Sequence, residues 1–278
     1  MRLPVIKIPK RSSFAHKNDF GHILIIAGST GFSGAASLCA QSALATGAGL
    51  VTLMTWKESY LEVAQRTPAT VMLKKIQSKI SFVPYDVILI GPGLGRSLRT
   101  RKLVLNVLKQ PLPVILDADA LTCLSLKKMT STLKKRTAPT LLTPHIGEFS
   151  YLMEMSKEKI LKNSQELVKN AAIKTGSYIL LKSFISFLAT PEGCVFTHAH
   201  PNSGMSKGGS GDTLAGIIAG LIPQKKTSPR LTFEQSIYLG QRLHSQAGDL
   251  ARKKWGERSM SAVEVIASLS QILKKKQK

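Results

Sequence analysis

The sequence of 278 residues has the length of one large α/β domain, whose core is big enough to need no disulfide or structural metal. Hydrophobic residues make up 43% of the chain and charged residues 20%, which excludes an intrinsically disordered protein. Lysine and arginine total 39 against 16 acidic residues, and the net charge of +23 favours an anionic partner, either a nucleic acid or a phosphate-rich small molecule.

The positive charge is concentrated in short runs that are typical of solvated surfaces. The runs are 74–75, 127–128, 134–136, 225–226 and 274–278. None is interleaved with aromatic residues, as in proteins that bind single-stranded nucleic acid, and aromatic residues make up only 6% of the chain. The pattern therefore disfavours nucleic acid as a partner.

The N-terminus and the longest apolar run predict a protein without a membrane partner. Residues 1–9 lack the apolar core of a secretory signal, and the apolar run 214–223 is about half as long as a bilayer span. Cys39, Cys123 and Cys194 form no CxxC pair and are too few for a disulfide framework. These features predict a cytoplasmic protein with buried, reduced thiols.

Apolar runs bounded by glycine or proline, which are typical of buried parallel strands, alternate with segments of helical periodicity. The predicted elements are strand 23–27, helix 35–46, strands 50–54 and 87–90, helix 100–109, strands 114–116 and 140–142, helices 148–155 and 164–175, and strand 178–181. This alternation predicts a layered α/β fold with a mostly parallel central sheet and helices on both faces.

After residue 181 the pattern changes to a hairpin followed by helices. The predicted elements are strands 187–189 and 194–197 around the turn 191–193, then helices from about Thr213, over 233–253 and over 262–273. No internal repeat or low-complexity linker divides the chain. We therefore expect residues 1–278 to form a single domain, with its core at about 19–267 and a basic tail at 274–278.

The strongest chemical motif is Lys207-Gly208-Gly209-Ser210-Gly211-Asp212-Thr213, which runs directly into a predicted helix. Its glycines let backbone amides converge on one point, where the helix N-terminus adds partial positive charge and favours a phosphate. A carboxylate beside a phosphate site can take the proton of a hydroxyl group, as phosphoryl transfer requires. The alternative is that Asp212 only caps the helix.

Two further glycine-rich turns follow predicted strands. Gly28–Ala35 lacks the GxGxxG spacing of a Rossmann fingerprint, and Gly91–Gly95 follows the strand 87–90. Each is also compatible with a tight turn between a strand and a helix. No GxxxxGK[ST] motif occurs, which excludes a Walker-type loop.

Polar residues follow two other strands. In Asp117-Ala118-Asp119 one carboxylate could contact magnesium or a substrate hydroxyl, and we expect the other to cap a helix. In Thr143–Glu148 the histidine can donate to a ligand, and Glu148 suits a helix N-terminus. His198-Ala199-His200 places two imidazoles on one strand face without a third ligand nearby, so no metal site is predicted.

With these motifs the chain resembles the ADP/ATP-dependent NAD(P)H-hydrate dehydratases, a family of the ribokinase-like superfamily. The resemblance extends from about Asp19 to Ala267. Its motifs occur in the order 21–22, 28–34, 47–51, 91–95, 116–121, 143–148, 202–216, 244 and 247–249. Other ribokinase-like kinases share the segment 208–212, whereas the ordered set is much more specific.

The resemblance implies repair of hydrated NADH and NADPH. Phosphorylation of the ring hydroxyl would turn a poor leaving group into a good one, and elimination of phosphate would then restore the dinucleotide. Asp212 would deprotonate the hydroxyl, and the amides of Gly209–Gly211 would stabilise the transferring phosphoryl group. Residues at the family's positions for the hydrated dinucleotide are Ala35, Gly95, His145 and Asp212. Those implied for the nucleotide are Lys182, Ser183, Phe184, Ile185, Ser186, Gly208, Gly209, Ser210 and Gly211.

The resemblance also implies partners. The co-substrate is ADP in bacteria and ATP in eukaryotes, with Mg²⁺, and a chain of this kind looks bacterial and hence ADP-using. A homo-oligomer is expected. Because the chain has no room for the epimerase domain often fused upstream, it would handle the S-epimer, and a separate epimerase would supply it. The segment Lys182–Ser186 is bulkier than the family's Lys-Gly pattern, and Ile146 stands where proline is usual.

Two other functions remain open at this point. A ribokinase-like kinase of a small alcohol or vitamin precursor would use the same Asp212 and glycines but would release a phosphorylated product. A catalytically lapsed, basic binding protein would fit the charge of +23 and the altered segment Lys182–Ser186. Retention on nucleic acid that falls with salt, without nucleotide turnover, would indicate the latter.

Overall fold

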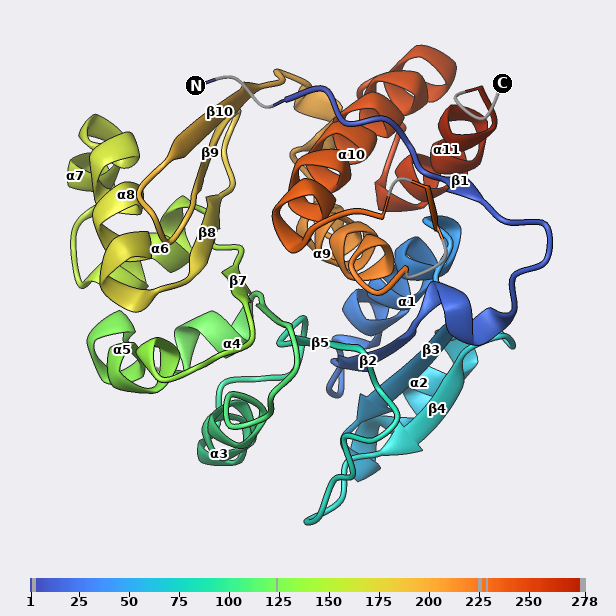
Figure 1. Cartoon of the computed structure of the whole chain (residues 1–278), viewed down its shortest axis with the longest axis horizontal. Helices are drawn as coiled ribbons and strands as arrows, with labels where there is room; N and C mark the ends of the chain where they lie inside the picture. Colours follow the sequence, from blue (N-terminus) through green and yellow to red (C-terminus); the bar gives the residue numbers. More distant parts are fainter. Residues whose placement is uncertain (2–3, 124, 225–226, 229, 276–278) are drawn as a thin grey trace. The chain divides into compact units, whose positions relative to one another are not determined.

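The computed structural model describes residues 1, 4–123, 125–224, 227–228 and 230–275. The charged run 225–226 and residues 276–278 of the basic tail lie outside the described residues. The chain divides into two compact units, one of residues 1–3 and 90–201 and the other of residues 4–89 and 202–278. Within the described residues, nine strands form a mostly parallel sheet, as the sequence predicts (Figure 1).

The unit of residues 1–3 and 90–201 carries five strands in the order β10-β9-β8-β7-β6. They are β6 (Val114–Leu116), β7 (Thr140–Leu142), β8 (Tyr178–Leu181), β9 (Ile185–Ala189) and β10 (Val195–Ala199). The pairs β6–β7 and β7–β8 are parallel, whereas β9 is antiparallel to β8 and forms the predicted hairpin with β10.

The helices of this unit connect its strands. They are α3 (Leu98–Val107), α4 (Asp119–Thr122), α5 (Leu126–Lys134), α6 (Ile146–Met153), α7 (Lys157–Lys162) and α8 (Ser164–Thr175). Helix α8 packs against β8 and β9, and α5 packs against α8. The residues of β6 and β7 are fully buried, which explains their continuous apolar character.

The unit of residues 4–89 and 202–278 carries β2 (His22–Ile26), β3 (Leu50–Thr55) and β4 (Met72–Lys75) as parallel neighbours. Strand β5 (Val87–Ile90) crosses the boundary between the units at Ile90. A separate two-stranded sheet joins β1 (Lys10–Arg11) to β11 (Thr227–Ser228). The 3₁₀ helices are η1 (Lys17–Phe20), η2 (Lys57–Ser59) and η3 (Ser203–Met205).

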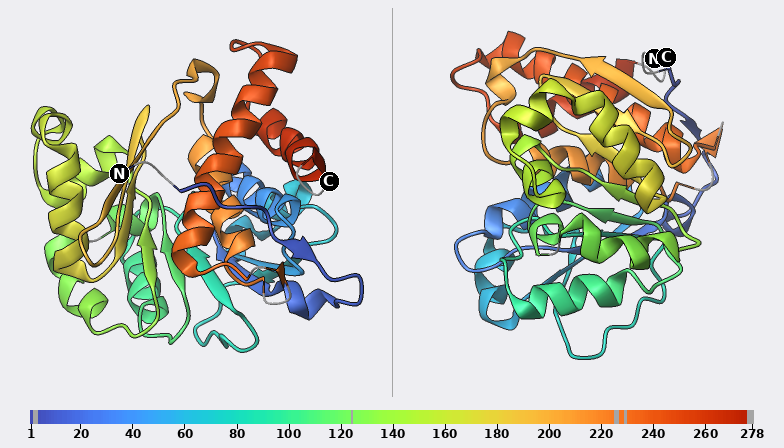
Figure 2. Two further views of the ribbon diagram at one scale, coloured as in Figure 1. Left: turned by 45° about the horizontal axis from the view of Figure 1, so that its top comes forward. Right: turned by 90° about the vertical axis from the view of Figure 1, so that its left-hand side faces the viewer.

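Three of the α-helices of this unit contribute buried residues to one apolar cluster. The α-helices of the unit are α1 (Ser33–Ala45), α2 (Tyr60–Arg66), α9 (Ser210–Leu221), α10 (Phe233–Trp255) and α11 (Ala262–Lys275). Figure 2 shows α10 and α11 side by side, and buried residues of α9, α10 and α11 form one cluster. No helix in the described ranges has both the length and the apolarity that a membrane span needs. The three cysteines form no disulfide with one another. Cys39 is buried as expected, whereas Cys123 is half-buried and Cys194 is exposed.

Helices α1 and α9 approach closely because α9 carries glycine where they meet. A Cβ atom at Gly216 would collide with the hydroxyl of Ser42 and the carbonyl of Cys39, and one at Gly220 would collide with Thr46. Contact through glycine therefore sets the separation of the two helices. Helix α9 is the one that contains Asp212 in its first turn.

We expect Gly216→Ala to lower the free energy of unfolding by about 2 kcal/mol, because the added methyl group meets backbone that cannot move alone. Denaturant unfolding measures this loss. Gly208→Ala is the matched control, since no heavy atom lies within 4 Å of its added Cβ. A loss in the control as large as that in Gly216→Ala would contradict the packing explanation.

Candidate active site

The glycine loop (residues 207–212) enters helix α9 earlier than predicted. Gly209, with φ +89°, is the N-cap, and the helix begins at Ser210 rather than near Thr213. Asp212 is therefore the third helical residue, and the alternative that it merely caps the helix is wrong. The first amides of a helix point, with the helix dipole, toward its N-terminal end, and that of Ser210 also donates to the Lys207 carbonyl over 3.4 Å. This arrangement suits a phosphate.

The glycine loop is held by two hydrogen bonds and two packing contacts within its own unit. The ammonium of Lys207 donates to the carbonyls of Arg258 (2.5 Å) and Met260 (2.6 Å). Gly209 lies against Leu38 and Ala262, so a side chain at this position would collide. These contacts fix the backbone before a ligand arrives, which is what electrostatic stabilisation of a transferring phosphoryl group requires.

The structure brings Ala35 to the same region as Asp212. The thiol of Cys39 on α1 donates to the carbonyl of Asp212 over 3.3 Å. Ala35 lies one helical turn before Cys39 and so shares its face of α1. Two residues that the resemblance assigns to the substrate, 177 positions apart in sequence, thus belong to one pair of packed helices.

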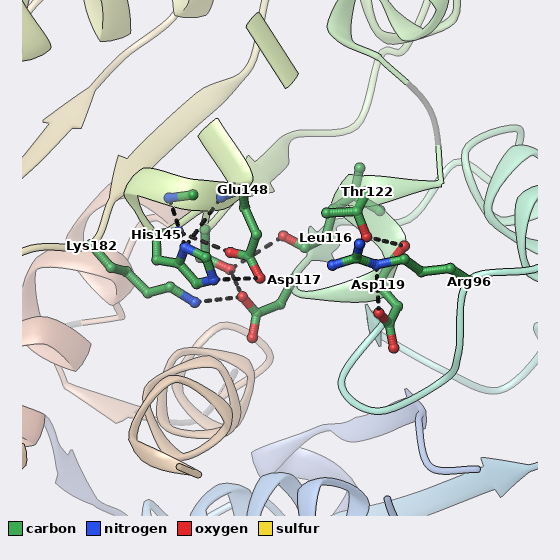
Figure 3. A network of polar contacts seen from close by, with 10 residues as sticks. Arg96, Leu116, Asp117, Asp119, Thr122, His145, Glu148 and Lys182 are labelled. Atoms are coloured by element: carbon green, nitrogen blue, oxygen red, sulfur yellow. Dashed lines mark hydrogen bonds and ion pairs between the residues drawn. The ribbon is translucent and has the colours of Figure 1, made fainter. Parts of the chain in front are cut away.

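In the other unit, a buried ion pair follows strands β6 and β8 (Figure 3). Asp117 is 1% exposed, and its Oδ1 accepts hydrogen bonds from the Lys182 ammonium (2.6 Å) and the Thr143 hydroxyl (2.7 Å). Lys182, predicted to contact the nucleotide, therefore already holds a carboxylate. Asp117, considered at first for magnesium or a hydroxyl group, is bound by protein groups.

His145 and Glu148 together form the start of helix α6. His145 Nδ1 accepts hydrogen bonds from the amides of Gly147 (2.9 Å) and Glu148 (3.1 Å), and Glu148 Oε2 accepts from the His145 amide (2.9 Å). Because Nδ1 acts as an acceptor, the proton of the neutral ring lies on Nε2. Burial raises the pKa of the Glu148 carboxyl, and the nearby Lys182 ammonium counteracts this effect. His145 Nε2 lies 3.4 Å from Glu148 Oε1, so this nitrogen faces the same carboxylate.

Gly95 is held by Asp119 in the same unit. The Gly95 amide donates to Asp119 Oδ2 over 2.8 Å, and Arg96 lies 3.5 Å from Asp119 Oδ1. The expectation that one of the two aspartates caps a helix is wrong, because the N-cap of α4 is Ala118 and no side chain caps it. The carboxylate of Asp119 instead points back to the Gly91–Gly95 turn.

The segment Lys182–Ser186 is shorter as a loop than predicted, because strand β9 already begins at Ile185. The Ser186 hydroxyl donates to the Ser183 carbonyl over 3.0 Å and closes the turn. The bulky side chain of Phe184 is 69% exposed. The departure from the family's pattern therefore adds an exposed aromatic ring rather than filling the core.

The structure gathers the predicted residues into two sets, one in each unit. Ala35 and the glycine loop with Asp212 form the first set, and Gly95, His145 and Lys182–Ser186 form the second. His198 and His200 stack at 5.5 Å, but no group of three or more His, Cys, Asp or Glu side chains in the described ranges could hold a metal ion. Glu62 belongs to no predicted motif, yet it contacts the Gly28–Ala35 turn from α2.

A mostly parallel α/β fold, with an aspartate in a glycine-rich helix start, places the chain among the ribokinase-like proteins. The model of the NAD(P)H-hydrate dehydratase family matches residues 23–271. The chain therefore belongs to the NAD(P)H-hydrate dehydratase family, as its motifs indicate.

Individual relatives agree with this assignment. A bifunctional NAD(P)H-hydrate repair enzyme of Thermofilum pendens is 31% identical over 97% of this chain and 53% of its own length. The ADP-dependent (S)-NAD(P)H-hydrate dehydratase of Bacillus subtilis is 32% identical over 77% of each chain. A crystal structure of the ADP/ATP-dependent dehydratase from B. subtilis, co-crystallised with ATP and Mg²⁺, has a TM-score of 0.87 and 26% identity over 97% of this chain and 95% of that one. The chain spans about half the length of the bifunctional relatives.

Proposed function

We propose that this protein dehydrates the S-epimer of hydrated NADH and NADPH in a reaction driven by a nucleotide. The observation that carries the proposal is the position of Asp212 in the first turn of α9, behind the N-cap Gly209. A carboxylate there lies beside amides that favour a phosphoryl group. Membership of the family supplies the substrate and the reaction.

In the proposed reaction the Asp212 carboxylate takes the proton of the ring hydroxyl. At the same time the hydroxyl oxygen attacks the terminal phosphorus of the nucleotide. The bond to the bridging oxygen breaks, and the shortened nucleotide leaves with that electron pair. The ring nitrogen then expels the new phosphate ester as free phosphate, and loss of a proton from the neighbouring ring carbon restores the dihydronicotinamide. The amides of Gly209–Gly211 stabilise the charge that develops on the phosphoryl oxygens.

We assign the remaining residues by the ligand that each contacts. Ala35, Gly95 and His145 contact the hydrated dinucleotide, with His145 donating through Nε2. Gly208–Gly211 and the segment Lys182–Ser186 contact the nucleotide. Within the second group Lys182 acts through its ion pair with Asp117, and the exposed Phe184 ring offers a stacking surface.

Mg²⁺ fits this proposal as an ion bound to nucleotide phosphates. Mg²⁺ keeps several waters and needs one or two protein ligands when phosphates are present, so a dedicated protein cage is not required. When bound, it would neutralise charge on the phosphates. We further propose ADP as the donor, cytoplasmic location, a homo-oligomer, a single functional domain and a separate epimerase that supplies the S-epimer; the B. subtilis relative is named ADP-dependent.

The deciding experiment follows the near-ultraviolet absorbance of the dihydronicotinamide ring after the protein is mixed with NADH hydrate, Mg²⁺ and either ADP or ATP. A rise in absorbance that requires nucleotide, with release of free phosphate, supports the proposal. The nucleotide that gives the faster rise is the preferred donor. A stable phosphorylated product without recovery of NADH would indicate a kinase instead. No nucleotide turnover, together with salt-sensitive retention on nucleic acid, would indicate a lapsed binding protein.

A prediction for His145 separates its two hydrogen-bonding roles. Asparagine is also a good N-cap, so His145→Asn should keep the start of α6 but lose the Nε2 donor, and we expect KM for the hydrate to rise about tenfold. His145→Ala should raise KM similarly and also lower the free energy of unfolding by about 1 kcal/mol. Steady-state kinetics and thermal unfolding measure the two effects, and an unchanged KM in both variants would remove His145 from substrate binding.

A further inference from the structure

The Gly28–Ala35 turn has little support from packing around its apex. Gly28 and Gly31 have positive φ angles of +84° and +80°, and a Cβ atom added at Gly31 or Gly34 would meet no heavy atom within 4 Å. Gly28 is different, because the side chains of Ala36, Val63 and Thr55 surround it. The start of the turn is therefore packed, whereas its apex and the entry into α1 are open.

Polar contacts from η2 and α2 take the place of packing at the apex. Glu62 Oε1 accepts a hydrogen bond from the buried Ser33 hydroxyl (2.7 Å), and Glu62 Oε2 accepts one from the Gly31 amide (3.2 Å). The hydroxyls of Thr30 and Ser59 lie 3.3 Å apart. One carboxylate thus binds the apex of the turn and the first residue of α1 at the same time.

Helix α1 has no cap of its own. Its N-cap is Phe32, whose side chain accepts no hydrogen bond from the helix, and its first turn contains no acidic residue. A carboxylate from another helix supplies the negative charge that a helix N-terminus favours. The Ser33 hydroxyl and then the Gly31 amide lower the pKa of Glu62, so the group is ionised at neutral pH.

This contact distinguishes the two glycine-rich turns that precede helices in this unit. At the glycine loop the supporting charge is the ammonium of Lys207, and the first-turn amides of α9 suit a phosphate. At the Gly28–Ala35 turn a protein carboxylate already lies against the start of α1. A second anion there would be repelled, so this turn presents its backbone and Ala35 to an uncharged part of a ligand.

We propose that Glu62 is a positioning residue for the dinucleotide substrate, which holds the Gly28–Ala35 turn and the start of α1 so that Ala35 meets the substrate. The inference rests on the proposed function, because it takes Ala35 as a substrate contact. Glu62 acts through the turn and does not touch the reacting atoms.

The test compares Glu62→Ala, Glu62→Gln and Ser33→Ala with the control Glu58→Gln, an exposed carboxylate four residues earlier. In Glu62→Ala we expect KM for the hydrate and Kd for NADH to rise about tenfold, because two charge-assisted hydrogen bonds are lost. The value of kcat and the affinity for ADP should stay within about twofold, since the glycine loop is unchanged. Glu62→Gln and Ser33→Ala should each give about a threefold rise, and Ser33→Ala should add little to Glu62→Ala.

Hydrogen exchange at the Gly31 amide provides a readout that needs no activity. We expect faster exchange in Glu62→Ala and wild-type exchange in Glu58→Gln. An unchanged Kd for NADH in Glu62→Ala, or a uniform loss of kcat, ADP affinity and thermal stability, would overturn the positioning role. Wild-type protein that binds NADH but turns over no hydrate would contradict the proposed function alone, and the NADH affinities would still decide the role of Glu62.

Discussion

Asp212→Asn is expected to lower kcat for the hydrated dinucleotide by about a thousandfold, within the range that a positioned general base contributes. Asparagine keeps the size of the side chain but cannot accept the proton of the ring hydroxyl. The backbone of Asp212 continues to accept from Cys39, and Gly209 remains the N-cap, so α9 should form as before. Single-turnover measurements with saturating nucleotide give the rate of the chemical step.

The affinity for nucleotide should change little in this variant, because the glycine loop binds through backbone amides. Removal of a negative charge near the phosphates should, if anything, strengthen binding. Glu58→Gln removes a carboxylate from the same unit, far along the sequence from the glycine loop, and serves as the control. A loss of turnover below about tenfold in Asp212→Asn, little over 1.4 kcal/mol of barrier, would exclude Asp212 as the central base.

Much of the fold could be predicted because its strands are short, apolar and bounded by glycine or proline. The predicted strands 87–90, 114–116, 140–142 and 178–181 agree with β5, β6, β7 and β8. Strand β4 was missed because Met72, Lys74 and Lys75 are exposed and only Leu73 is partly buried. An edge strand of this kind lacks the apolar run that reveals a central strand.

The helices show the same dependence on pattern. Helix α5 places Leu126, Met129 and Leu133 on one buried face. This helical spacing is visible in the sequence and would have predicted the helix. Helix α2 buries only Val63, so its sequence carries no such spacing, and the carboxylate of Glu62 had no local reason to be noticed. Its function depends on contacts with residues about thirty positions earlier, which a single sequence does not reveal.

The candidate site divides in the same way. The glycine loop could be predicted because all its groups are adjacent in sequence, and the structure corrects only where the helix begins. The Asp117–Lys182 pair could not, since its partners are 65 positions apart and come together only when β6, β7 and β8 align. The sequence therefore indicated Lys182 and Asp117 as separate candidates, Lys182 for the nucleotide and Asp117 for magnesium or a hydroxyl group.

Lys182→Met is expected to lower the free energy of unfolding by about 3 kcal/mol, since removal of one partner leaves a buried charge without its counter-ion. Lys182 is 17% exposed and Asp117 1%, so water cannot replace the lost ammonium fully. The loss of Lys182 also removes the charge that opposes the raised pKa of Glu148. The Thr143 hydroxyl remains on Asp117 but provides only one hydrogen bond. Urea unfolding at neutral pH measures the change.

The double variant Asp117→Asn with Lys182→Met distinguishes the ion pair from a contact with the nucleotide. If the two side chains serve mainly each other, the double variant should recover about 2 kcal/mol of the stability lost in Lys182→Met, because no buried charge is left unpaired. If Lys182 also binds the nucleotide, the double variant should regain stability while KM for the nucleotide stays raised. Recovery of both quantities would show that the ion pair alone orders the segment Lys182–Ser186, whereas recovery of neither would show that Asp117 and Lys182 act independently of each other.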